Sequence, residues 1–123
     1  MVSTSAADIP ATACLRQALA TRAAVGATVT YQQLARELEL RAPASIHRLT
    51  LALEALMTED AEAGRPQLAA LVVSRTRNGL PAPGFFAHLR TLGLHDGPEQ
   101  GAAAAACHRR LLAEVANHYA AGD

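Results

Sequence analysis

Two amphipathic segments joined by a short turn lie between residues 28 and 53. Leu34 and Leu38 in the first segment are four residues apart, and the apolar residues of the second segment return at the same helical period, which predicts two helices that each bury one face. Thr30 stands where its hydroxyl can cap the first helix, and Pro43 interrupts the chain before the second. The pattern is typical of a helix-turn-helix, although any pair of packed helices in a small helical domain gives the same periodicity.

The composition is typical of one globular domain, and the formal net charge is zero. The chain has 123 residues, enough for a single domain with a hydrophobic core. Its 11 basic residues are all arginines and are balanced by 11 acidic residues, so no global positive field attracts nucleic acid. This use of arginine, together with abundant alanine, is typical of a GC-rich bacterial genome. Aromatic residues make up only 3% of the chain, which leaves few side chains for base stacking.

The sequence carries no pattern for membrane insertion or metal binding. The N-terminal residues lack the basic start and apolar run of a signal peptide, and no stretch is apolar over the length needed to span a bilayer. The five histidines have no metal-site spacing and are expected at the surface or at helix caps. The two cysteines, Cys14 and Cys107, are expected to be free and buried. We therefore expect a cytoplasmic protein without a cofactor or a metal.

The first helix is expected after a short tail. Residues 1–8 are small and polar and are expected to be disordered, whereas residues 9–123 are expected to form a single domain. Pro10 suits the first turn of a helix that runs to about Val25, with Asp8 or a neighbour as its N-cap. Gly26 is the predicted C-cap. The residues predicted to be buried by this helix are Cys14, Leu15, Ala18 and Leu19.

A wing is predicted after the helix-turn-helix. Its second helix is expected to reach about Thr58 and to end in a solvated acidic patch, residues 59–62. The run Leu71-Val72-Val73 is typical of a strand, and Asn78-Gly79 is a strong two-residue turn signal. Since prolines follow the turn, any returning strand must be short and at an edge. A hairpin in this position is the wing of a winged helix.

Two further helices are predicted, over about residues 84–92 and residues 99–120. The residues expected to be buried by the first are Phe85, Phe86 and Leu89. The last helix repeats apolar side chains at successive i+4 steps, at Cys107, Leu111, Val115 and Tyr119. Such a stripe normally packs on the core of its own domain, and a seam between two copies in a homodimer is the alternative. The predicted fold class is therefore α+β, mainly α: a winged helix-turn-helix with extra N- and C-terminal helices.

The segment Val29-Thr30-Tyr31-Gln32-Gln33-Leu34-Ala35 resembles a known family. It is similar to the start of the DNA-binding domain of O6-alkylguanine-DNA alkyltransferases and alkyltransferase-like proteins, where Thr/Ser-Tyr-x-x-Leu-Ala opens the first helix of the helix-turn-helix. The resemblance covers roughly residues 28–94. It implies a winged-helix domain that binds DNA.

The residues that carry the family's chemistry are replaced in this chain. The alkyltransferases have a Pro-Cys-His-Arg motif immediately before paired valines, and its cysteine accepts the alkyl group. Alignment on Val72 and Val73 places Leu68, Ala69, Ala70 and Leu71 at those four positions. Because Ala69 has no nucleophile, we expect no alkyl transfer. The sequence shows no Ser-His-Asp set and no phosphate-binding glycine loop, so we also expect no other enzymatic activity.

The distribution of arginines favours DNA more than the net charge does. The family uses an arginine near the start of the second helix, and the matching position is His47 or Arg48. Arg75 and Arg77 flank the expected wing tip, within a stretch free of acidic residues, and basic wings contact the DNA backbone. We therefore predict a non-enzymatic protein that binds double-stranded DNA. The expected contacts are Tyr31, Arg41, Ser45, His47, Arg48, Arg75, Arg77 and Asn78.

Acidic residues in the same region favour an alternative partner. Glu37, Glu39 and Glu54 lie in or beside the helix-turn-helix and would repel phosphate if they faced it. A neutral chain also suits a winged-helix module for protein-protein interaction, which includes a homodimer through the last helix. An enzyme subunit whose catalytic residues lie on another chain is a third alternative.

Overall fold

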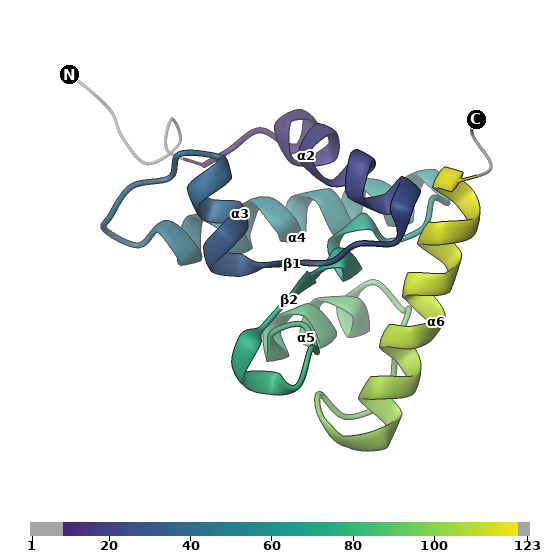
Figure 1. Cartoon of the computed structure of the whole chain (residues 1–123). Helices are drawn as coiled ribbons and strands as arrows, with labels where there is room; N and C mark the ends of the chain where they lie inside the picture. Colours follow the sequence, from purple (N-terminus) through teal and green to yellow (C-terminus); the bar gives the residue numbers. More distant parts are fainter. Residues whose placement is uncertain (1–8, 121–123) are drawn as a thin grey trace.

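A computed structural model describes residues 9–120, and most of these residues are helical (Figure 1). The predicted tail, residues 1–8, lies outside the described residues. The predicted α+β, mainly α class is confirmed, because the described helices accompany a small two-stranded sheet. In chain order the elements are α2 (Thr12–Val25), β1 (Val29–Thr30), α3 (Tyr31–Glu37), α4 (Ser45–Ala63), the 3-10 helix η1 (Leu68–Leu71), β2 (Val72–Val73), the 3-10 helix η2 (Arg75–Arg77), α5 (Pro83–Thr91) and α6 (Gly101–Ala120).

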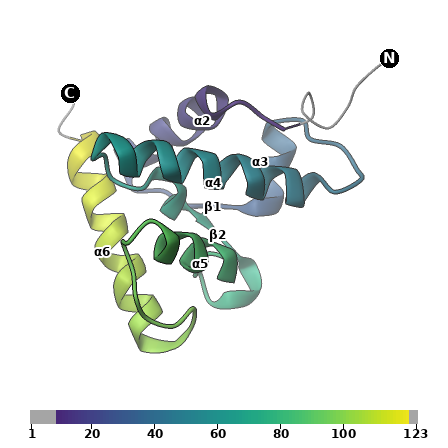
Figure 2. The ribbon, with the colours of Figure 1, turned by 180° about the vertical axis from the view of Figure 1, so that it is seen from behind.

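Helix α4 runs across the molecule and the other helices are arranged around it. Helices α2 and α3 lie on one side of it, and α5 lies below it (Figures 1 and 2). Helix α6 stands at the end opposite the turn between α3 and α4 (Figures 1 and 2). Buried side chains from all five of these helices join one hydrophobic cluster together with η1 and the strands.

The two strands of the sheet are parallel. Val29 lies opposite Val72, and Thr30 lies opposite Val73. Parallel neighbours need a long crossover connection, and α3 and α4 provide it here. The strand predicted around residues 71–73 is therefore present, but its partner is the extended segment before α3 rather than a later strand.

The turn of the predicted wing forms, but its second strand does not. Asn78 and Gly79 both have positive φ, and the amide of Leu80 donates to the carbonyl of Arg77 over 3.1 Å. No strand follows Val73 within the described residues. The chain instead forms η2. The amide of Ser74 donates to the carbonyl of Leu80 over 2.8 Å, which closes the loop. The two prolines after the turn lack amide donors, which explains why no ladder extends from it.

The first helix follows the prediction at its C-terminal end more closely than at its start. Helix α2 ends at Gly26, whose φ of 71° gives the expected left-handed cap. It begins at Thr12 with Ala11 as N-cap, later than expected, and Asp8 lies outside the described residues. Leu15 and Leu19 are buried as predicted, but Cys14 is exposed. The prediction for Cys14 was wrong because the helix directs the side chain next to Leu15 away from the core.

Helix α4 continues through the acidic patch to Ala63, beyond the predicted end at Thr58. Asp60 is fully buried, so the prediction of a solvated patch was wrong for this residue. Its carboxylate accepts hydrogen bonds from Arg16 Nη1 at 2.8 Å and Arg65 Nε at 3.0 Å. The sequence pattern could not show that these two cations meet Asp60 inside the fold.

The last helix packs on the core of its own chain. Cys107, Leu111 and Val115 are buried, as predicted, where α6 lies against α2 and η1. His108 is also buried, at 5% exposure, and its Nε2–H donates to the carbonyl of Ala70 over 2.8 Å. The expectation of surface or cap positions was therefore wrong for His108. This hydrogen bond satisfies a polar group of the 3-10 helix that the core would otherwise leave unpaired.

Candidate functional site

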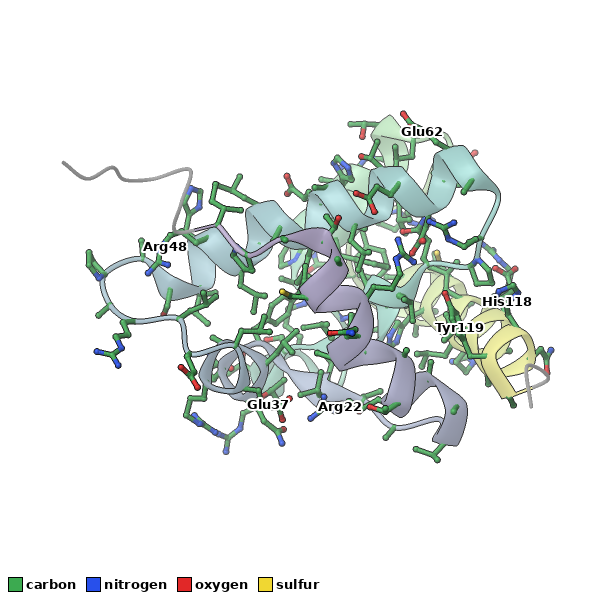
Figure 3. All side chains as sticks on the ribbon, turned by 90° about the horizontal axis from the view of Figure 1, so that it is seen from above. Arg22, Glu37, Arg48, Glu62, His118 and Tyr119 are labelled. Atoms are coloured by element: carbon green, nitrogen blue, oxygen red, sulfur yellow. The ribbon has the colours of Figure 1, made fainter. Side chains whose placement is uncertain are left out.

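The turn between α3 and α4 is fixed by an arginine that was predicted to contact DNA. Thr30 caps α3 as predicted, because its hydroxyl accepts the amide of Gln33 at 3.1 Å. Arg48 lies beside the turn at the start of α4 (Figure 3). Its guanidinium donates to the carbonyl of Pro43 at 3.0 Å and to the carbonyl of Arg41. Arg48 is half-buried and stabilises the turn from within.

Arg77 also makes an internal contact, which connects the loop over residues 74–82 to the segment before α6. Its guanidinium donates to the carbonyl of Glu99, just before α6. Arg90 of α5 donates to the carboxylate of Glu99 at 2.7 Å and to the carbonyl of Gly97 at 3.2 Å. Arg77 and Arg90 therefore both stabilise the connection between α5 and α6.

Two of the predicted cations remain available to a ligand. The guanidinium groups of Arg41 and Arg75 are exposed and make no hydrogen bond or ion pair with another residue in the described part of the chain. Arg41 lies in the turn between α3 and α4, whereas the loop that carries Arg75 lies lower in both views, beside α5 (Figures 1 and 2). His47 and Asn78 are exposed, and Ser45 is half-buried at the first position of α4.

Tyr31 occupies the inside of the predicted site rather than its surface. Its side chain is 7% exposed, and its hydroxyl oxygen accepts the backbone amide of Ala82 at 3.0 Å. Burial raises the pKa of the Tyr31 hydroxyl, and the bond from Ala82 partly opposes the shift. This contact ties the start of α3 to the loop before α5.

A small pocket opens beside Tyr31, between α4 and the start of α5. Its volume is about 80 Å³, well above the roughly 10–15 Å³ that one water molecule needs. Its wall is formed by Tyr31, Thr50, Leu53, Glu54, Met57, Ala69, Ala82, Gly84 and Phe85. Ala69 is the position at which the family resemblance places the reactive cysteine, so the wall carries a methyl group there. The apolar repeat of the sequence identified Leu53 and Phe85 as core residues but gave no signal that they border a cavity.

The outer face of α4 is acidic beyond its first turn. From residue 49 to residue 63 the helix contains no arginine, whereas Glu62 is exposed near its C-terminal end (Figure 3). Leu51 is one of the few large apolar residues exposed in the described structure, at 38%. The only arginine of α4 is Arg48, in its first turn.

Comparison of the chain with protein-family models, with curated protein sequences and with solved structures finds no match. Among the described residues, no group of three or more His, Cys, Asp or Glu side chains is placed to hold a metal ion. Between residues 9 and 120, no helix has the length and apolar character required to cross a membrane.

Proposed function

We propose that this chain is a non-enzymatic protein that binds duplex DNA through phosphate contacts of Arg41 and Arg75, which lie in two separate loops. The observation that supports this proposal is that two exposed guanidinium groups, on separate loops, have no partner among the described residues. Guanidinium groups bind phosphate oxygens in a planar geometry. The proposal takes α4 as the second helix of the pair and the loop over residues 74–82 as the counterpart of a wing.

The internal roles of Arg48 and Arg77 reduce the expected strength of binding. Each phosphate that a protein neutralises on duplex DNA contributes about −0.9 to the slope of log K against log salt. Two contacts, from Arg41 and Arg75, therefore give a slope of about −2, and non-specific affinity in the micromolar range or weaker. If Arg48 and Arg77 also turned outward, the slope would approach about −4.

Fluorescence anisotropy with a labelled duplex across a salt series tests this proposal. Arg41→Ala and Arg75→Ala should each reduce the slope by about one, equally for different DNA sequences. Arg109→Ala is the matched control, because Arg109 is exposed on α6 and has no partner among the described residues. Absence of binding at low salt, or an equal effect of all three substitutions, would refute the proposed interface.

The alternative is a module for protein-protein interaction, which the outer face of α4 favours. Leu51 is exposed on this helix together with Glu62, and no cation follows Arg48 along it. An exposed apolar side chain on a helix whose C-terminal half is acidic is suited to a basic partner surface. If the anisotropy experiment detects no DNA binding, this alternative replaces the first proposal.

A further inference from the structure

The pocket beside Tyr31 combines an apolar wall with one acidic side chain. Met57, Leu53 and Phe85 contribute apolar surface, and Tyr31 and Phe85 contribute aromatic rings. Phe85 and Tyr31 are otherwise buried, so only the parts of their rings at the pocket wall are available to a ligand. Such a wall suits a small alkyl group or a cation that lies against the aromatic rings.

Glu54 is the only ionisable carboxylate in this wall. It is half-buried, and its carboxylate makes no hydrogen bond or ion pair with any residue among positions 9 to 120. It lies close to the start of α5, because a Cβ atom added to Gly84 would be 4.0 Å from Glu54 Oε2. A carboxylate at the edge of an apolar pocket is stabilised by a cation that enters the pocket.

We propose that this pocket binds the head of a small organic cation, an alkylammonium or guanidinium group, whose charge contacts Glu54. The alkyl part of the ligand lies against Leu53, Met57 and Phe85. This inference is independent of the proposed DNA contacts, which use Arg41 and Arg75 in the neighbouring loops. The same cationic head is present on a free amine and on a lysine or arginine side chain of a partner protein.

The test is a titration of the full chain, labelled with 15N, by n-butylammonium chloride, followed by amide chemical shifts. Butan-1-ol serves as the neutral probe of similar shape, at the same ionic strength. We expect n-butylammonium to shift the amides of Gly84 and Phe85 with a millimolar Kd and butan-1-ol to bind much more weakly. Because hydrogen bonds to charged groups contribute about 1.5–3 kcal/mol, Glu54→Gln should raise the Kd by about 10-fold to 100-fold.

Glu62→Gln is the matched control. It removes the same charge from the same helix, but Glu62 does not line the pocket, so the Kd should be unchanged. Gly84→Ala provides a second variant: the added methyl meets only Glu54 Oε2 within 4 Å, so the fold accommodates it. This methyl narrows the pocket and should weaken binding even if Glu54→Gln fails to fold.

Three results would overturn the inference: no shift with n-butylammonium, equal binding of butan-1-ol, or an unchanged Kd in both Glu54→Gln and Gly84→Ala. A short lysine peptide and its Nε-acetylated form then distinguish the two sources of the cation. Tighter binding of the lysine peptide than of n-butylammonium, lost on acetylation, assigns the cation to a partner protein, and equal binding assigns it to a free amine. Both of these results support the site.

Discussion

Replacement of Asp60 by alanine should destabilise the protein more than loss of any exposed acidic residue. The carboxylate of Asp60 is fully buried and accepts hydrogen bonds from Arg16, from Arg65 and from the amide of Leu68 at 3.3 Å. It therefore joins α2, the C-terminal end of α4 and the start of η1. Asp60→Ala removes the acceptor for all three donors at once.

The size of the destabilisation depends on what each of the three donors can still hydrogen-bond after the substitution. Leu68 is buried, so its unpaired amide costs about 1–3 kcal/mol. The side chains of Arg16 and Arg65 are 27% and 39% exposed, so water replaces part of what they lose. Each of these pairs then contributes about 1 kcal/mol at most, as exposed ion pairs do. A gain in helix propensity of up to about 0.7 kcal/mol opposes these losses, which leaves a net loss of about 3 kcal/mol.

Urea unfolding followed by circular dichroism measures this loss directly. At this chain length, about 3 kcal/mol corresponds to a fall in Tm of roughly 10–15 °C. Glu62→Ala is the control, because Glu62 is exposed on the same helix and the change should stay within about 0.5 kcal/mol. Asp60→Asn retains an acceptor for Leu68 and should lie between the two. If Asp60→Ala proved no more destabilising than Glu62→Ala, the contacts of the Asp60 carboxylate would not stabilise the fold as argued.

Two further predictions concern α6. Burial lowers the pKa of His108, and its bond to Ala70 partly opposes the shift. The folded protein therefore binds a proton at His108 more weakly than the unfolded chain does. As a consequence, the free energy of unfolding should fall as the pH drops below about 6.5. Urea titrations at several pH values should show that His108→Gln removes most of this fall while His47→Gln, at an exposed position, leaves it. Replacing Leu111 and Val115 together by Asp should unfold the protein, because each buried unpaired charge costs several kcal/mol. Circular dichroism and light scattering check this, and a folded monomer derived from a dimer would contradict it.

Local signals in the sequence predicted most helix boundaries. Thr30 caps α3 through its hydroxyl, and Gly26 ends α2 in the left-handed conformation. These features depend on the few residues around each position, so a single sequence reveals them. The packing of the apolar stripe of α6 was predicted equally well, because any apolar surface of the core can cover it.

Features that depend on distant residues were predicted less well. Asp60 looked like part of a solvated patch, since Arg16 is far away in the sequence and reaches it only in the fold. The strand at Val72 was recognised, but its pairing with Val29 was not, because the turn at Asn78-Gly79 favoured a local partner. The partner of a strand is the backbone segment that the tertiary fold places next to it, and this segment can be distant in the sequence.

The same limit applies to the predicted binding residues. The sequence identified the arginines but not what their guanidinium groups contact. Arg48 and Arg77 donate to backbone carbonyls, while Arg41 and Arg75 have no partner among the described residues. Composition and spacing do not separate these two roles, because both need a flexible cation near a turn. Glu54 was considered only as a source of repulsion, and its position at a pocket became visible from the packing of α4 against α5.

The packing of α2 against α6 affects how the chain folds during translation. Helix α2 leaves the ribosome early, whereas α6, which covers part of its apolar face, is synthesised last among the described elements. At roughly 5–20 residues per second, the interval between them is about 5–20 s. During that time Leu15 and Leu19 of the nascent chain lack part of their native cover. Nascent chains stalled before α6 should therefore expose apolar surface to chaperones and proteases, so that quality control can distinguish them from chains in which α6 has been made.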